Sequence, residues 1–406
     1  MLVTAKPEDV GLSGERLDRI ATWIDGYIDA GKLPGALVLV ARRGQVAYCL
    51  TRGLRDREAG LAVEEDTIFR FYSMTKPITS VGIMMLYEQG LFQLDDPIAR
   101  YLPEFAEMQV YVSGEGADAV MQPARQQITF RHLLTHTAGL TYGNRGQTPV
   151  EAAYRANGVN FANRQGDLAE PARKLADQPL LCHPGTEWNY SVSTDLLGRL
   201  TEVISGQPLD QYFQQHILGP LGMVDTSFAI APNKQDRFAA NYEHTDGNGL
   251  ALADSPHDSV YRNVTLFSGG GGLTSTAGDY HRFTQMLRGK GELDGVRLLG
   301  RKTVEYMTEN HLPDNGDLTS MGQPVHSETS YDGIGFGLGF SVMLDPAKAQ
   351  VIGSPGEHAW GGAASTAFWI DPEEDMSVIF LTQLMPSSTY PLRRELRVLT
   401  YQALIE

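Results

Sequence analysis

Strand-like segments lie at both ends of this chain, and helical segments fill its middle. Near the N-terminus, an apolar run at residues 35–41 reaches a turn at Arg43-Gly44 and returns at residues 45–50, which predicts a β-hairpin. Three more strand-like runs lie in the last third, at residues 337–343, 363–370 and 376–382. The simplest architecture that buries all these strands is one α/β (α+β) lobe made from both termini.

Apolar residues at helical spacing and terminal capping signals predict helices around this sheet and between its halves. The segments concerned are residues 12–30, 73–90, 195–204, 210–218, 279–288 and 392–404. We expect residues 1–72 and 265–406 to form the α/β lobe and residues 73–264 to form a mostly helical lobe inserted into it. A run of four glycines at residues 269–272 is expected to be flexible or tightly turned.

The net charge is −16, which disfavours binding to nucleic acids and to anionic membranes. It favours a small-molecule substrate that is neutral or cationic. The N-terminal residues lack the basic and long apolar regions of a signal peptide, and no apolar run reaches the length of a membrane span. We therefore expect a cytoplasmic protein with no nucleic acid or membrane partner, and the sequence leaves the oligomeric state open.

The segment Ser73-Met74-Thr75-Lys76 combines a nucleophile with a possible base. Residues three apart on a helix share a face, so the Lys76 amine is expected beside the Ser73 hydroxyl. A lysine acts as a base when desolvation or a second cation holds it neutral, or when a neighbour relays its proton. Ser73 also lies at a predicted helix N-terminus, where free N–H groups favour negative charge. The alternative is that Ser73 is an ordinary helix cap.

Other catalytic signals are weak or absent. His132 and His136 have a metal-ligand spacing, but Leu133 stands where the zinc-protease pattern needs glutamate, so we expect no metal. There is no Gly-x-Ser-x-Gly elbow, phosphate loop or dinucleotide fingerprint. These observations argue against an α/β-hydrolase and predict that no cofactor is needed.

The residues around Ser73 carry a family resemblance. The segment Phe69-Arg70-Phe71-Tyr72-Ser73-Met74-Thr75-Lys76 resembles the active-site segment of the class C β-lactamase superfamily, which includes penicillin-binding proteins and family VIII carboxylesterases. Four further segments agree in the right order, at residues 128–140, 184–191, 220–226 and 360–362. The resemblance covers nearly the whole chain. It implies a β-lactamase/transpeptidase-like fold, with an antiparallel sheet flanked by helices, an inserted mostly helical lobe, and the active site between the lobes.

The resemblance also implies roles for particular residues. Tyr190 would be the third catalytic residue beside Ser73 and Lys76, exchanging protons with the leaving group and with water. The backbone N–H groups of Ser73 and Ala363 would form the oxyanion hole, with Ala363 on an edge strand. Substrate would contact Val192 and the segment Trp360-Gly361-Gly362, although Trp360 is equally consistent with packing at a lobe interface. His358, two residues earlier, would either position that strand or contact substrate.

Two departures from the lactamase pattern shift the expected substrate. The usual Tyr-x-Asn motif reads Tyr190-Ser191-Val192 here, and Trp360-Gly361-Gly362 stands in place of Lys-Thr-Gly. A side-chain amide and a cation that contact β-lactams are thereby lost, which costs about 1.5–3 kcal/mol for a charge-assisted contact. The chain is therefore most similar to family VIII esterases.

We therefore expect a serine carboxylesterase that cleaves short-chain acyl esters through an acyl-enzyme on Ser73. Three alternatives remain open at this point. The same nucleophile would serve a β-lactamase or D-alanyl carboxypeptidase-like hydrolase, or an acyltransferase. The protein could also be a catalytically inactive binding or sensing protein.

Overall fold

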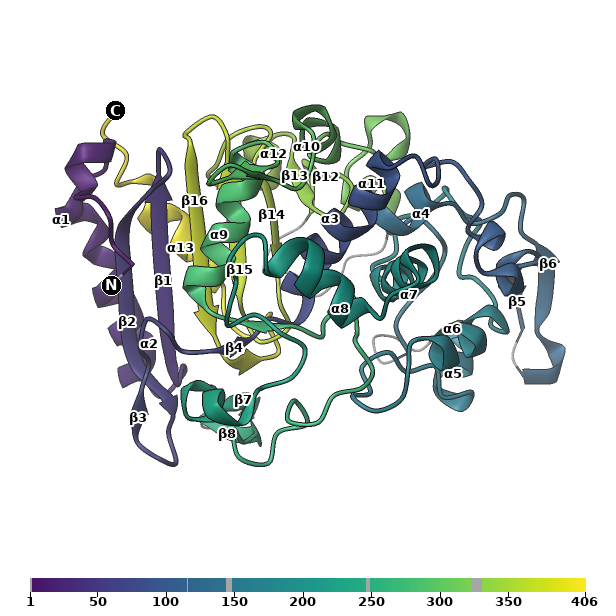
Figure 1. Cartoon of the computed structure of the whole chain (residues 1–406), viewed down its shortest axis with the longest axis horizontal. Coiled ribbons are helices and arrows are strands. Elements are labelled where there is room, and N and C mark those ends of the chain that lie inside the picture. Colours follow the sequence, from purple (N-terminus) through teal and green to yellow (C-terminus); the bar gives the residue numbers. More distant parts are fainter. Residues whose placement is uncertain (1, 115, 144–147, 246–248, 323–330) are drawn as a thin grey trace.

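The two ends of the chain meet in one antiparallel sheet. The computed structural model describes residues 2–114, 116–143, 148–245, 249–322 and 331–406. Within these residues the main sheet has eight strands, in the order β12-β13-β14-β15-β16-β1-β2-β3. Strand β1 (Gly35–Arg42) pairs on one side with β2 (Gln45–Asp56) and on the other with β16 (Met376–Thr382). The predicted hairpin and the pairing of both termini are confirmed (Figure 1).

The C-terminal half of the sheet differs in detail from the predicted strands. Its members are β12 (Ile334–Phe336), β13 (Ser341–Met343), β14 (His358–Gly361) and β15 (Ala367–Asp371), and β3 (Leu61–Ala62) ends the opposite side. The single strand predicted at residues 337–343 is wrong, because the chain reverses between β12 and β13 through Gly339, whose φ is +102°. The strand predicted from residue 363 begins only at Ala367.

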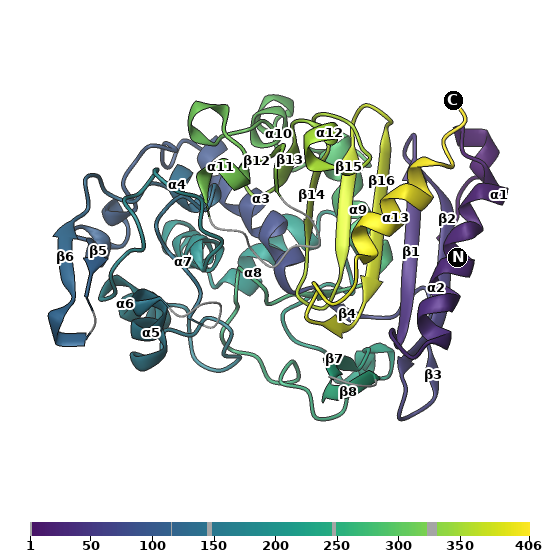
Figure 2. The same cartoon turned by 180° about the vertical axis from the view of Figure 1, so that it is seen from behind.

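Both faces of the sheet are covered by helices. Helices α2 (Arg19–Asp29) and α13 (Leu392–Tyr401) pack on the face seen in Figure 2, and α9 (Ala277–Arg288) packs on the opposite face (Figure 1). Successive side chains of a strand point to opposite faces. Accordingly, Val38 joins the core under α2 and α13, whereas Leu39 joins the larger core that extends to the helical lobe. Strand β1 is therefore buried on both faces.

The helical lobe is organised around α3 (Thr75–Glu88), which packs against α7 (Ser193–Ser205). Most of α3 is buried, and Gly82 lets it approach Phe213 in α8 (Leu209–Phe213). The other helices are α1 (Gly14–Leu17), α4 (Phe130–Leu134), α5 (Pro149–Ala156), α6 (Ala169–Ala176), α10 (Arg301–Met307), α11 (Leu318–Met321) and α12 (Pro346–Ala349). None of the helices in the described ranges is both long and apolar enough to span a bilayer.

Short strands also occur outside the main sheet. A hairpin joins β5 (Gln109–Ser113) to β6 (Val120–Pro123), and a two-stranded sheet joins β10 (Glu292–Leu293) to β11 (Val296–Arg297). Strand β7 (Asn241–Thr245) pairs with β8 (Gly249–Asp254) and, in parallel, with β17 (Leu384–Met385). Within the segment assigned to the helical lobe, Tyr242 and Glu243 of β7 therefore pair with Leu384 and Met385 of the C-terminal segment.

The four-glycine segment is tightly packed against α7. The carboxylate of Asp195, in the first turn of α7, accepts hydrogen bonds from Ser268 Oγ (2.5 Å) and from the backbone N of Gly270 (2.9 Å). A Cβ on Gly270 would lie 2.2 Å from Asp195 Oδ2, whereas a Cβ on Gly271 would have no neighbour closer than 3.6 Å. Of the two expectations for this segment, the tight turn is the correct one, since the backbone N of Gly272 donates to the Ser268 carbonyl oxygen at 2.8 Å.

This packing gives a stability prediction. Gly270→Ala should lower the free energy of unfolding by about 1–3 kcal/mol, because the added methyl overpacks a buried carboxylate. Gly271→Ala is the matched control and should change it by less than about 0.5 kcal/mol. Urea denaturation of both variants measures the difference. Equal stabilities would contradict the close packing of Gly270 on Asp195.

Candidate active site

Ser73 is held at the start of α3 by a short strand and a tight turn. Strand β4 (Phe69–Arg70) pairs with β9 (Thr274–Ser275), and the fully buried Arg70 forms a 2.5 Å ion pair with Asp254. The chain then turns through Tyr72, which has a φ of +44°, and Ser73 follows within a 3-10 turn. A positive φ at a tyrosine is strained, and such strain is typical of functional sites. The turn leaves Ser73 half-exposed, directly before the helix.

Lys76 lies beneath Ser73 and is almost fully buried, with 2% of its surface exposed. Its Nζ donates to Ser73 Oγ at 3.3 Å and to the carbonyl oxygen of Gly270 at 2.6 Å. The same nitrogen lies 4.8 Å from the centre of the Tyr190 ring and 5.6 Å from the centre of the Tyr142 ring. The predicted proximity of the serine hydroxyl and the lysine amine is thus present in the structure.

The surroundings of Lys76 favour its charged form. Burial by itself lowers the pKa of this amine, but Tyr142, Tyr190 and Asp195 outweigh it and raise the pKa above its usual value. The sequence had suggested a lysine held neutral by desolvation or by a second cation. Here nearby oxygens that carry or develop negative charge stabilise the ammonium instead. The ammonium form of Lys76 is therefore favoured beside Ser73.

Tyr190 reaches the site from the loop that precedes α7. Its ring packs between His136 and Trp360, with centroid distances of 4.9 Å and 5.2 Å. Trp360 Nε1 donates to the Tyr190 hydroxyl at 3.3 Å. The backbone N of Asn189 donates to the carbonyl oxygen of His136 at 2.9 Å, which fixes the loop next to the tyrosine. An aromatic cluster with one polar edge thus sets the orientation of the phenol.

Ala363 lies opposite Ser73 in the turn between β14 and β15. The prediction of an edge strand is wrong, because β14 is paired on both sides and Ala363 follows its end. A Cβ on Gly362 would lie 2.4 Å from the Phe71 carbonyl oxygen, so glycine is needed for this turn to approach the chain before Ser73. Arg393 Nη2 holds the turn by donating to the carbonyl oxygens of Gly362 (2.9 Å) and Thr366 (3.0 Å).

The backbone N–H groups of Ser73 and Ala363 are available as donors. Among the residues that the structure describes, neither group has a hydrogen-bond acceptor. Both residues line two adjoining hollows. An oxyanion hole requires two such backbone donors beside the reacting serine, which keeps the expected pair, Ser73 and Ala363, as candidates.

The two hollows differ in size and lining. The smaller, of about 230 Å³, is lined by Tyr190, Trp360, Gly361 and Gly362. The larger, of about 670 Å³, is lined by Val192 and by residues of the helical lobe. Ser73 lines both hollows. An ester whose carbonyl lies at the Ser73 hydroxyl can therefore place its acyl group in one hollow and its alcohol group in the other.

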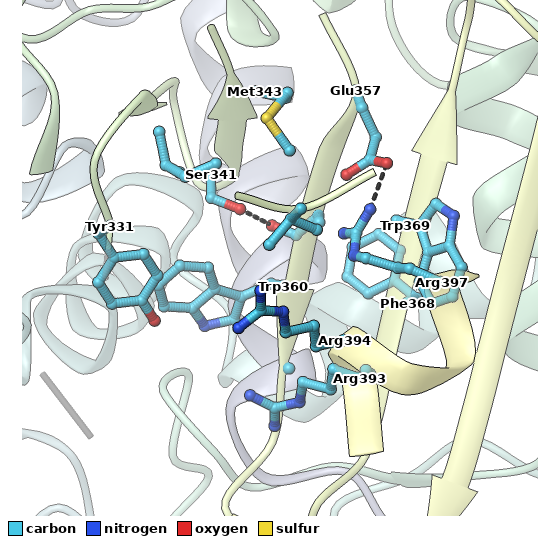
Figure 3. A pocket seen from close by; sticks show the side chains of 15 residues that line it. Tyr331, Ser341, Met343, Glu357, Trp360, Phe368, Trp369, Arg393, Arg394 and Arg397 are labelled. Carbon is cyan, nitrogen blue, oxygen red and sulfur yellow. Dashed lines mark hydrogen bonds and ion pairs between the residues drawn. The ribbon is translucent and has the colours of Figure 1, made fainter. Parts of the chain in front are cut away.

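Trp360 also lines a third cavity, of about 120 Å³, between the sheet and α13 (Figure 3). Arginine side chains of α13 enter this cavity, and Arg397 pairs with the buried Glu357. Ser341 Oγ donates to the Ala359 carbonyl oxygen at 2.9 Å and joins β13 to β14 beside it. Trp360 is half-buried, lines the smaller hollow and packs on Tyr190 of the helical lobe, a position that agrees with both expectations, a wall of the site and packing at a lobe interface.

His358 does not reach either hollow beside Ser73. Its side chain is buried with 4% exposed, its ring packs on Phe340, and its Nδ1 lies 3.3 Å from the Gly356 carbonyl oxygen. Burial lowers the pKa of His358 to about 4, so the ring is neutral at physiological pH. Of the two roles considered for it, positioning the strand agrees with this location and substrate contact does not.

Sequence reasoning missed two residues of the site, Tyr142 and Asp195. Tyr142 hydrogen-bonds Lys76 and lines the larger hollow. Asp195 lines the same hollow, and its carboxylate helps to raise the pKa of Lys76. Tyr142 comes two residues after the recognisable segment 128–140, which is the one signal that could have drawn attention to it. No local pattern distinguishes Asp195 from any other acidic residue in the first turn of a helix.

The fold and this site define a class of enzyme. A serine hydroxyl that is hydrogen-bonded to a buried lysine and lies near tyrosines, between an antiparallel sheet and a helical lobe, is typical of a serine hydrolase or acyl-transferring enzyme. The chain belongs to the Beta-lactamase family, whose profile matches residues 20–402.

Characterised relatives include both esterases and acyltransferases. Esterase EstB of Burkholderia gladioli is 32% identical over 397 residues, which cover 93% of this chain and 92% of EstB. The structure of EstCE1, described as a hydrolase with promiscuous acyltransferase activity, is similar with a TM-score of 0.76 and 29% identity, covering 95% of this chain and 99% of EstCE1. Simvastatin synthase LovD of Aspergillus terreus has a TM-score of 0.81 and 26% identity, covering 96% and 98% of the two chains. The predicted β-lactamase-like fold and the resemblance to family VIII esterases are thus confirmed.

The burial of His358 gives a prediction about acid stability. Its pKa is about 4 in the folded protein and 6.5 when unperturbed, so its contribution to stability is complete above pH 6.5 and is lost as the pH falls toward 4. His358→Phe should remove this dependence, which amounts to at most about 1.4 kcal/mol per pH unit. Urea denaturation between these pH values checks it. Ester kcat/KM at neutral pH should stay within roughly threefold of wild type, and a large rise in KM would instead indicate substrate contact.

Proposed function

We propose that this protein is a carboxylic ester hydrolase that forms an acyl-enzyme on Ser73. The observation that carries the proposal is the contact between Ser73 Oγ and the buried Lys76 ammonium, 3.3 Å apart, at the junction of two hollows. A serine hydroxyl needs a neighbouring base and donors for the oxyanion, and the site supplies candidates for both. The substrate we propose is a short-chain acyl ester.

The first step is attack of Ser73 on the ester carbonyl. We assign the base to a tyrosine oxygen, with Tyr190 as the first candidate, because the raised pKa of Lys76 leaves its amine without a free electron pair. The Lys76 ammonium stabilises Tyr190 as the phenolate before the attack, and the phenolate takes the Ser73 proton to become a phenol as the bond to the carbonyl carbon forms. The backbone N–H groups of Ser73 and Ala363 stabilise the oxyanion of the tetrahedral intermediate.

The second half of the cycle reuses the same groups. Tyr190 returns the proton to the departing alkoxide, leaving the acyl group on Ser73. Water, deprotonated by Tyr190 beside Lys76, then attacks the acyl carbonyl, and Ser73 leaves as the free hydroxyl. The step consumes one water and releases one carboxylic acid, so no cofactor is required.

Esters are favoured over β-lactams by the groups that face the hollows. Val192 presents an apolar side chain where lactamases have an amide, and Trp360 presents an indole where they have a cation. Neither side chain can make a charge-assisted contact with a β-lactam. We therefore propose much weaker turnover of cephalosporins than of simple esters, since such a contact is worth about 1.5–3 kcal/mol.

Acyl transfer is the second candidate function. EstCE1, described as a hydrolase with promiscuous acyltransferase activity, is similar to this chain over almost its whole length, and a monacolin J acid methylbutanoyltransferase of Aspergillus terreus is 29% identical over 377 residues. The chemistry is the same until deacylation, when an alcohol or amine replaces water as the nucleophile. The two hollows beside Ser73 would allow an acceptor to enter after the first product leaves.

The nucleophile is tested by substitution of Ser73. Ser73→Ala should reduce hydrolysis of p-nitrophenyl butyrate by at least about 10³-fold, since covalent catalysis is lost while the fold is kept. A serine-reactive phosphonate should add one adduct to the wild type and none to the variant, by mass spectrometry. Retained activity in the pure variant would overturn the mechanism, and an unlabelled wild type would favour a binding protein.

Acyl transfer is tested by adding an acceptor alcohol to the same assay. The ratio of new ester product to carboxylic acid released measures how the acyl-enzyme partitions between transfer and hydrolysis.

The contribution of Tyr142 is tested separately. Tyr142→Phe should lower kcat about 10- to 100-fold, because it removes the phenolic oxygen that hydrogen-bonds Lys76. Tyr154→Phe makes the same chemical change in the same hollow and should leave kcat within roughly threefold. Steady-state kinetics on p-nitrophenyl butyrate compares the two. Equal effects would mean that Tyr142 acts only through packing.

A further inference from the structure

The larger hollow beside Ser73 has an arginine in its wall whose position is fixed. Arg164 lies between α5 and α6, and its carbonyl oxygen accepts from the backbone N of Thr265 (2.9 Å) and of Leu266 (3.3 Å). Its guanidinium lies 4.1 Å from the centre of the Tyr261 ring, and its Nη2 donates to the Tyr261 hydroxyl. The segment is thereby held against the chain that leads to the four glycines of the active site.

One nitrogen of this guanidinium lacks a partner. Arg164 Nη1 is buried and, within the described ranges, makes no hydrogen bond. A buried donor without an acceptor costs about 1–3 kcal/mol, and more when it carries charge. The side chain lines the hollow together with Ser73 and Ala363. A ligand that supplied a hydrogen-bond acceptor to Nη1 would remove the free-energy cost of leaving this donor unpaired.

The charges around the hollow favour an anionic acceptor. The charges of Arg164 and Lys76 both attract the Asp195 carboxylate, whose Oδ1 already accepts hydrogen bonds from Ser268 and Gly270. Arg155 also lines the hollow, and Asp195 is its one acidic member among the residues described. Two cations therefore share a single buried carboxylate. The local field is positive in a chain of net charge −16, the reverse of what the total charge suggested.

We infer that the larger hollow binds the carboxylate of an ester substrate that carries one, with Arg164 as its partner. The inference rests on the proposed esterase function and names its substrate class. The guanidinium matches a carboxylate in shape and charge. Apolar side chains of Val159, Phe161 and Met385 line the same hollow and would contact the carbon chain between the ester and the carboxylate. Arg164 contacts the substrate carboxylate, away from the reacting carbonyl. It therefore selects which esters bind and takes no part in breaking the ester bond.

The experiment compares charged esters with their uncharged counterparts. The first pair is the mono-p-nitrophenyl ester of adipic acid and its methyl-capped form, which place the carboxylate on the acyl side. The second pair is 4-acetoxybenzoate and its methyl ester, which place it on the alcohol side. In one of the pairs, wild-type kcat/KM should favour the charged ester by at least about tenfold, or about 1.4 kcal/mol. The pair that responds identifies which side of the ester enters the hollow.

Arg164→Met should abolish this preference by lowering kcat/KM for the charged ester at least about tenfold more than kcat/KM for the capped ester. Arg173→Met is the matched control, because it removes the same charge from an exposed position on α6 and should keep the preference. Arg164→Gln replaces the methionine variant if that variant has a lowered melting temperature. The inference is overturned if neither pair shows a preference, or if the preference survives in the Arg164 variants.

These outcomes also separate the inference from the function beneath it. If wild type cleaves none of the four esters and takes no phosphonate, the proposed esterase function fails. If it cleaves the capped esters as fast as the charged ones, the function stands and only the role of Arg164 fails.

Discussion

The buried ammonium of Lys76 is the interaction on which the rest of the site depends. Removing a charge from water costs several kcal/mol unless hydrogen bonds and opposite charge replace the lost solvent. The Gly270 carbonyl, Tyr142, Tyr190 and Asp195 supply that replacement. They come from three separate stretches of the chain, so the helical lobe must be fully folded before Lys76 can be buried as a cation. The requirement explains why the glycine segment packs so closely on α7: a side chain at Gly270 would meet Asp195.

The other half of the site depends on closure of the sheet by the two chain ends. Strand β1 brings the N-terminal hairpin against β16, and the strands beyond β16 carry the turn that holds Ala363. Helix α13, from the very end of the chain, reaches back so that Arg393 bonds the carbonyl oxygens of Gly362 and Thr366. The two donors proposed for the oxyanion hole thus come from different layers, and their separation is set by how the sheet packs on α3.

Substrate selection, in this view, lies away from the catalytic residues. Trp360 and Val192 remove the contacts on which β-lactam recognition relies, and the hollows that remain are wide. Within the larger hollow, the arginines create a positive environment that the overall charge conceals. Local charge governs binding because groups held within a few ångströms, in poorly hydrated surroundings, interact more strongly than charges spread over the surface.

Much of the fold and the catalytic core was predictable from the sequence alone. The N-terminal hairpin, strand β16 and the predicted helices followed from local hydrophobic periodicity, and Ser73 and Lys76 from a spacing that a single helical turn brings together. Tyr190, Trp360 and Ala363 required the family resemblance, because nothing in their immediate sequence marks them. Only the tertiary structure decided that Lys76 is stabilised as a cation, that His358 is buried away from the hollows, that Ala363 lies in a turn, and that Tyr142, Asp195 and Arg164 face the site. Each of these depends on contacts between residues far apart in the chain, which local pattern does not encode.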